Sequence, residues 1–246
     1  MFSYNLLACV LWFCFSPLAF ALELRVVAAE FWGPPYVFSG KEIAKKGIVK
    51  ELVEAFAKEA KVSVVYINLP RKRIETELKN GSVHIAPISN PGWYADHNGL
   101  DWSDPVFEEK NQFVLMQDGK LKIDSVQDLR GKKLGAMLGF VYPNLTTEIQ
   151  SGAVTRVDVK DYVQITRMLK KGRVDTFVTS DIVFRYMKKI NPEAQKLRVA
   201  DFVLAQHSIH WCVAKSAPIT VQQINEILAK LKSSGKVAEI MKKYLD

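Results

Sequence analysis

The chain has 246 residues, of which 48% are hydrophobic and 24% are charged, and its formal net charge is +8. This composition excludes a disordered or fibrous chain, and the length is enough for one large or two small α/β domains. The positive charge is spread over lysine pairs such as Lys170-Lys171 and Lys242-Lys243, mostly at the ends of predicted helices. Because these pairs form no basic stripe with interleaved aromatic residues, we expect no nucleic-acid partner.

An apolar stretch occupies residues 1–21, MFSYNLLACVLWFCFSPLAFA, and ends in Ala19-Phe20-Ala21. This ending resembles a secretory signal that is cleaved after Ala21. A retained membrane anchor is the alternative, but Ser16-Pro17 interrupts the stretch, which is shorter than the roughly 20 apolar residues of a spanning helix. We therefore expect export. Cleavage would leave Cys212 as the one remaining cysteine, so we expect no intramolecular disulfide.

After this stretch, the chain alternates predicted strands and helices. Residues 23–29 read as a strand and are followed by the turn-rich segment EFWGPPYVFSG. Residues 47–61 have apolar side chains along one face, which predicts an amphipathic helix, and the β-branched run at 62–67 predicts a strand.

Two segments of the chain resemble each other. Residues 74–89 read IETELKNGSVHIAPIS and residues 165–180 read ITRMLKKGRVDTFVTS. Each predicts a helix that stops at a glycine, followed by a buried strand that ends in serine, which is half of a βαβ unit. Two copies predict two similar α/β lobes, although a chance recurrence of helix, glycine and strand is the alternative. Since parallel sheets bind ligands beyond the carboxyl ends of their strands, Ser89 and Ser180 would lie at a cleft between the lobes.

The remaining elements follow the same alternation. We expect extended segments at 112–116, 133–138, 154–159 and 206–214. We expect helices near Pro143, at 181–189, and on both sides of Gly235 in the C-terminal tail.

Sequence motifs for catalysis or metal binding are missing. The chain has no GxSxG, HExxH, GxGxxG or GxxxxGK[ST] sequence. His207 and His210 are three residues apart in a predicted strand, so their side chains would point to opposite faces. We therefore expect no catalytic residue, no metal and no cofactor.

Aromatic and charged residues near the predicted cleft are candidates for binding a small solute. Aromatic faces suit the apolar part of a ligand, although ordinary loop packing is the alternative for each of them. Arg73 at a helix start would clamp a carboxylate, unless it belongs to a solvated charge cluster. Asp181 would accept hydrogen bonds from a ligand ammonium, unless it caps the next helix. The full predicted set is Trp32, Tyr36, Arg73, Ser89, Asn90, Trp93, Phe140, Tyr142, Ser180 and Asp181.

Several motifs in their order along the chain resemble the family 3 extracellular solute-binding proteins. They are Pro34-Pro35-Tyr36, Gly47-Ile48-Val49, LKNGSVHIA, WSDPVF, DLRGKKLGAMLG, GRVDTFVTSD and the tail INEILAKLKSSGKVAEIMKKYL. The resemblance implies a two-lobed type II periplasmic-binding-protein fold with two crossing hinge strands. It implies lobe 1 from residues 22–112 and 203–246, and lobe 2 from residues 113–202, after a signal peptide at 1–21.

The chain departs from the pattern of the family's amino-acid receptors. The loop SNPGWYADHNG lacks the arginine that holds the ligand carboxylate, and Ser180 stands where the ammonium-binding aspartate is expected. Phe140 replaces the usual Thr or Ser. The segments PRKR (70–73) and GFVY (139–142) instead resemble a subgroup whose members often lack a defined transporter partner.

The resemblance implies a monomeric periplasmic protein that captures a small polar or anionic solute, an amino acid or a related compound, for an ABC permease. An orphan or sensory receptor that does not transport is one alternative. A dehydratase-like enzyme is another, and it would need a general acid such as Glu30 or Asp181 in the cleft.

Overall fold

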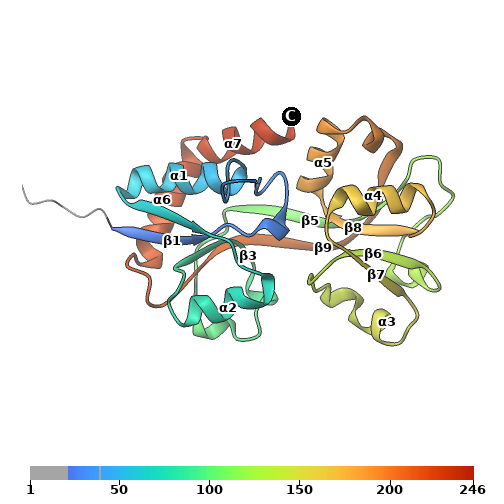
Figure 1. The fold of residues 1–246 in the computed structure, drawn as a ribbon, viewed down its shortest axis with the longest axis horizontal. Coiled ribbons are helices and arrows are strands. Elements are labelled where there is room, and N and C mark those ends of the chain that lie inside the picture. Colours follow the sequence, from blue (N-terminus) through green and yellow to red (C-terminus); the bar gives the residue numbers. More distant parts are fainter. Residues whose placement is uncertain (1–21, 39) are drawn as a thin grey trace, which may run out of the picture.

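The computed structural model describes residues 22–38 and 40–246, and the predicted signal peptide at 1–21 lies outside the described residues. The described chain folds into two α/β lobes side by side (Figure 1). The predicted two-lobed α/β fold is thus confirmed. In the part of the chain that is described, no helix has both the length and the apolar character needed to cross a membrane.

Lobe 1 is built on a parallel sheet in which β1 (Glu23–Val27) lies between β2 (Ser63–Ile67) and β3 (Ile85–Ser89). Helices cover both faces of this sheet, with α2 on the face opposite to α1 (Figure 1). The helices of lobe 1 are α1 (Ile48–Ala60), α2 (Arg71–Lys79), α6 (Val221–Ser233) and α7 (Lys236–Leu245).

Lobe 2 repeats this plan. Here β6 (Lys133–Met137) lies between β7 (Thr155–Val159) and β8 (Thr176–Ser180), and all three strands are parallel. Its helices are α3 (Thr146–Gln150), α4 (Tyr162–Lys170) and α5 (Asp181–Ile190).

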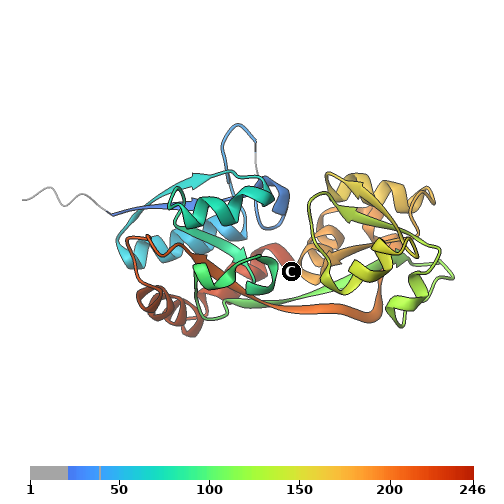
Figure 2. The same ribbon diagram turned by 90° about the horizontal axis from the view of Figure 1, so that it is seen from below.

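Two long antiparallel strands, β5 (Phe107–Met116) and β9 (Leu197–Val213), run side by side from one lobe to the other (Figure 2). They join the two sheets in the order β2-β1-β3-β9-β5-β8-β6-β7, and the short strand β4 (Asp101–Trp102) also pairs with β9. Both long strands begin earlier than expected: β5 starts at Phe107 with the polar run EEKN, and β9 starts at Leu197. The predicted lobe boundaries fall on the paired residues Gln112 and Val203, and they stay a prediction.

The two similar segments of the sequence occupy equivalent places. The first forms α2 and β3, and the second forms α4 and β8. In the sheet, β3 lies beside β9 and β8 lies beside β5, so the two copies flank the linking strands. Gly81 and Gly172 follow the two helices with φ of 76° and 64°, the left-handed conformation that glycine adopts without strain.

The helix α1 connects the core of lobe 1 to the segment after β1. Its apolar face is buried, and the ring of Phe56 lies 4.9 Å from the ring of Trp211 on β9. At its start, the amides of Ile48 and Val49 donate to the carbonyls of Pro35 and Tyr36. The start of α1 therefore fixes the position of the segment that carries Tyr36.

Candidate ligand-binding cavity

A cavity of about 310 Å³ lies between the lobes, and both lobes and strand β5 contribute to its wall. This volume suits a small ligand. Eight aromatic side chains line it: Phe31, Trp32, Tyr36, Trp93, Tyr94, Phe140, Tyr142 and Tyr162. Its charged residues are Arg71 and Glu109, and its polar residues include Asn111, Thr179 and Ser180.

The segment after β1 forms one wall of the cavity. A short 3₁₀ turn, Glu30–Trp32, brings Phe31 and Trp32 together at a ring distance of 5.6 Å. Further along, the ring of Tyr36 stacks on Phe107 at 6.4 Å, and the side chain of Tyr36 is buried. The backbone of this wall is hydrogen-bonded to the start of α1 through the carbonyls of Pro35 and Tyr36.

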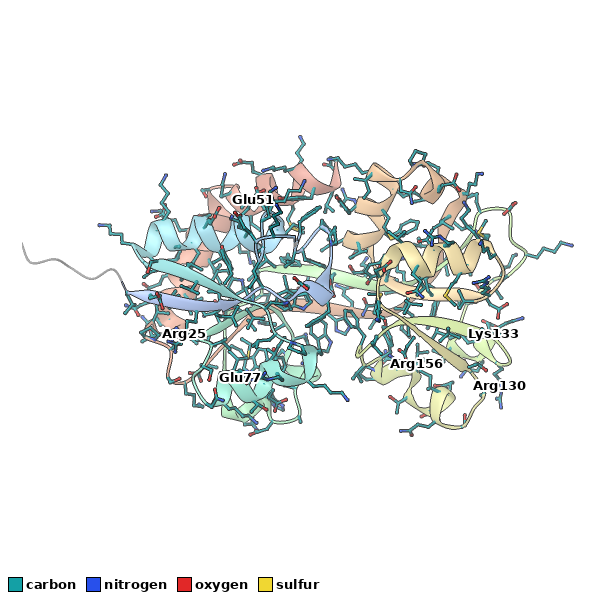
Figure 3. The ribbon with its side chains drawn as sticks, in the orientation of Figure 1. Arg25, Glu51, Glu77, Arg130, Lys133 and Arg156 are labelled. Carbon is teal, nitrogen blue, oxygen red and sulfur yellow. The ribbon has the colours of Figure 1, made fainter. Side chains whose placement is uncertain are left out.

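The opposite wall comes from the segment between β6 and α3. Arg156 of β7, labelled in Figure 3, donates hydrogen bonds to the carbonyls of Met137 and Phe140 at 3.2 and 2.9 Å. Its guanidinium also lies 5.6 Å from the ring centre of Tyr142. Burial raises the pKa of Tyr142 to about 12, so its hydroxyl stays protonated at neutral pH. Arg156 thus positions Phe140 and Tyr142.

The third wall is held together by Arg71 at the start of α2. Its guanidinium donates to the carbonyl of Trp93 at 2.5 Å and lies 5.2 Å from the ring centre of Tyr94. The hydroxyl of Tyr94 is in turn hydrogen-bonded to the hydroxyl of Ser89 at 2.8 Å. Arg71 is therefore the cavity residue with a positive charge, and it is also a support for the aromatic wall.

Strand β5 contributes a carboxyl group to the cavity. The side chain of Glu109 is buried, and its Oε2 accepts a short hydrogen bond from the hydroxyl of Tyr36. Burial raises the pKa of Glu109 to about 7, and the nearby negative charge of Asp181 acts in the same direction. At neutral pH, this carboxyl is therefore divided between its protonated and ionised forms.

Six of the ten predicted site residues line the cavity: Trp32, Tyr36, Trp93, Phe140, Tyr142 and Ser180. They come from both lobes, and the fold brings them to one place. Ser180 has a second role, because its Oγ accepts a hydrogen bond from the amide of Val183 and caps α5. The cap of this helix is thus Ser180, and the alternative that Asp181 forms it is wrong.

The other four lie outside the cavity lining. Arg73 is 63% exposed and pairs with Glu77 one turn along α2; Figure 3 labels Glu77 on this helix. Ser89 lies behind Tyr94, and the side chain of Asn90 donates to the carbonyl of Ser208. Asp181 accepts from the amide of Lys110. Each of these side chains has an internal partner that accounts for its position.

Glu109, Arg71, Tyr94 and Tyr162 also line the cavity but are absent from the predicted set. A signal for Glu109 exists in the sequence, because Phe107, Glu109 and Asn111 lie on one face of a strand in FEEKNQF. No such signal separates Arg71 from Arg73 before the start of the helix is known. Glu30, considered as a general acid, is exposed and does not line the cavity.

The residues that the structure describes include no group of three or more His, Cys, Asp or Glu side chains placed to hold a metal ion. Cys212 is buried, and burial raises the pKa of its thiol well above the usual range. Its thiol is therefore protonated at neutral pH and unsuited to act as a nucleophile.

The sequence model of the bacterial extracellular solute-binding proteins, family 3, matches residues 25–246. The chain belongs to this family. The match covers both lobes and the two linking strands, so the whole described fold is that of the family.

Individual members of the family are similar to this chain. A "Probable histidine-binding protein" of Neisseria gonorrhoeae is 26% identical over 203 residues, which cover 81% of this chain and 74% of that protein. The solved structure of an ancestral arginine-binding protein bound to arginine has a TM-score of 0.74 at 26% identity, over 92% of this chain and 100% of the other. A histidine kinase sensor domain with similarity to periplasmic binding proteins shares the fold, with a TM-score of 0.75 at 20% identity over 92% and 97% of the two chains.

Proposed function

We propose that this protein captures a small amino acid or related solute in the cavity between its lobes and delivers it to an ABC permease. The observation that carries this proposal is a cavity of about 310 Å³ whose wall combines eight aromatic side chains with a few polar and charged groups from both lobes. Membership of a family of extracellular solute-binding proteins and similarity to an amino-acid-binding relative support it.

Binding by such a cavity follows from the fold. The two lobes are linked by β5 and β9, so a change of angle between the lobes would open the cavity and admit a ligand. Closing the lobes removes water from the ligand, which strengthens its polar contacts with Arg71, Glu109 and Ser180. The aromatic side chains then enclose its apolar part. A closed monomer in the periplasm would be the form that a membrane permease recognises.

The test is a thermal-shift screen of the mature chain, residues 22–246, with the common amino acids, simple amines and organic acids. A ligand at a hundred times its Kd adds about 2.7 kcal/mol to the free energy of unfolding, which is a readily measured shift in the midpoint. Isothermal titration calorimetry then gives the stoichiometry, expected to be one. If no compound in these three classes raises the midpoint, the proposal is wrong.

A sensory receptor and a transport protein would both bind the ligand in this cavity, so binding measurements do not distinguish the two roles. They are separated in cells, by measuring uptake of the radiolabelled ligand with and without this protein. Loss of uptake supports transport, whereas unchanged uptake with a lost response to the ligand supports the sensory alternative.

The enzyme alternative has one observation in its favour. Glu109 is a carboxyl group with a raised pKa in the cavity, which is the requirement for a general acid. Incubation with prephenate-like acids tests this alternative directly. Turnover that is lost in Glu109→Gln would replace solute binding by catalysis as the proposed function.

A further inference from the structure

Glu109 is the acidic residue that lines the cavity. Its side chain is 6% exposed and lines the cavity, so its carboxyl group is removed from bulk water. Among residues 22–38 and 40–246, no Lys, Arg or His side chain forms an ion pair with it. A buried carboxylate without a cationic partner is unfavourable, and a ligand that supplies the cation removes this cost.

The groups around Glu109 do not neutralise it. Asp181, at the start of α5, has the same sign of charge, and the hydroxyl of Tyr36 donates to Oε2 without carrying a charge. His207 is the partner of Glu109 across the β5–β9 ladder, and burial lowers the pKa of its imidazole, which favours the neutral form. Burial also raises the pKa of Tyr162 on α4, so this phenol stays neutral.

The positive charge of the cavity lining lies on a different wall from Glu109. The guanidinium of Arg71 donates to the carbonyl of Trp93 and lies over the ring of Tyr94. Both groups belong to the lobe 1 wall, whereas Glu109 is on the linking strand β5. Among the described residues, Arg71 and Glu109 form no ion pair with each other, so the carboxyl group is left for a ligand.

The aromatic wall favours the same kind of ligand group. Eight aromatic side chains line the cavity, and the negative faces of such rings attract organic cations. Burial raises the pKa of Tyr36 and of Tyr162, and the negative charge of Glu109 raises both further. A cation at the carboxylate would thus lie among aromatic rings that also stabilise it.

From this geometry we infer that Glu109 is the counter-charge for a ligand ammonium group, so that the cavity selects amine-bearing solutes with a compact apolar body. This inference rests on the proposed function and names the class of solute. The ammonium would donate to the carboxylate oxygens of Glu109, while the aromatic side chains surround the rest of the ligand. A simple organic anion would face a carboxylate of its own sign at the same place.

The experiment uses two sets of matched compounds with the mature wild-type protein. One set is leucine, 3-methylbutylamine and 4-methylpentanoate; the other is phenylalanine, 2-phenylethylamine and 3-phenylpropanoate. Within each set, the apolar body is constant, and the ammonium or the carboxylate is removed. Thermal shift and calorimetry at pH 8 should show binding of the amines or amino acids in at least one set and no binding of the acids.

The variant Glu109→Gln keeps the shape of the side chain and removes its charge. We expect it to bind the amine at least about thirtyfold more weakly, because a buried charge pair is lost. Glu108→Gln is the matched control, since Glu108 is the neighbouring exposed carboxylate on the same strand. Its affinity for the amine should equal that of the wild type.

The outcomes separate the two proposals. If the acids bind the wild type and the amines do not, or if Glu109→Gln keeps the affinity for the amine, then the role of Glu109 is wrong while solute binding stands. If none of the compounds in either set or in the wider screen binds, then solute binding itself is wrong. The wild-type comparison needs no variant, so it decides the question even if Glu109→Gln does not fold.

Discussion

The ring of Phe31 lies edge-on to the ring of Phe140, with ring centres 5.8 Å apart and ring planes at 89°. Phe31 belongs to the segment after β1 in lobe 1, and Phe140 belongs to the segment after β6 in lobe 2. Both line the cavity, so one contact joins the two lobes beside the proposed ligand.

This contact predicts the effect of Phe140→Ala. Loss of an edge-to-face pair costs about 1 kcal/mol, so the affinity for the ligand should fall roughly fivefold or more. Calorimetry with the best ligand of the screen measures this change. Leu138→Ala is the control, because Leu138 is 56% exposed in the same segment and does not line the cavity. An unchanged affinity in Phe140→Ala would contradict a closed form held by this pair.

Arg71 and Arg73 are two residues apart on α2 but have different surroundings. Arg71→Gln removes the hydrogen bond to Trp93 and the cation over Tyr94, so we expect about 1 kcal/mol of destabilisation and weaker ligand binding. Arg73→Gln removes an ion pair with Glu77 that is exposed to solvent, so we expect little change in stability or affinity. Urea unfolding and ligand titration of both variants test this difference. A larger loss of affinity in Arg73→Gln than in Arg71→Gln would show that Arg73 belongs to the ligand-binding site.

The buried carboxyl of Glu109 predicts a dependence of stability on pH. Its pKa rises from an ordinary value of 4.5 to about 7 on folding, so the folded state binds more protons between these values. The contribution of this group is therefore most favourable below pH 4.5 and is lost as the pH rises through 7, by on the order of 3 kcal/mol. Urea unfolding of the ligand-free wild type and Glu109→Gln at pH 5 and pH 8 measures it.

In this comparison, the variant should gain stability relative to the wild type on going from pH 5 to pH 8. The other titratable groups contribute almost equally to both proteins and cancel in the difference. Glu108→Gln should track the wild type at both pH values. A constant difference between wild type and Glu109→Gln would show that the carboxyl titrates in its ordinary range.

Gly47 predicts a link between backbone geometry and ligand binding. It has a φ of 130°, and a Cβ atom at this position would lie 2.3 Å from the carbonyl oxygen of Tyr36. Gly47→Ala must therefore displace the backbone that carries Tyr36, at a cost of about 1–3 kcal/mol or more. Thermal unfolding should show a lower midpoint, together with weaker ligand binding.

Gly40→Ala is the matched control for this variant, because a Cβ atom there would meet nothing within 4 Å. Its midpoint and affinity should stay near those of the wild type. Equal behaviour of the two alanine variants would mean that the segment before α1 adapts without cost.

Much of the fold is predictable from the sequence because its signals are local. The helix predicted at 47–61 is α1 at 48–60, and the two similar segments gave the correct helix, glycine and strand in both lobes. The lengths of β5 and β9 were wrong: β9 begins at Leu197 rather than at Gln206, and polar residues such as Glu108 and Lys110 at the start of β5 do not read as a buried strand. They lie in the ladder because the two strands support each other between the lobes.

The cavity was predicted in part for a similar reason. Aromatic residues such as Trp32 and Phe140 were found because their loops follow predicted strands. Glu109 was missed because its burial depends on Tyr36, which is 73 residues away in the chain. Arg73 was preferred to Arg71 because the rotation of α2 about its axis is set by packing of Ile74 and Leu78.

The path of β9 has a consequence for the synthesis of the protein. Strand β3 of the lobe 1 sheet pairs with residues 210–213 of β9, and α6 and α7 pack on the same lobe. The first 100 residues to leave the ribosome therefore cannot complete their own domain. Lobe 2 has all of its parallel strands earlier, so the half of the protein that is made first is the last to be finished.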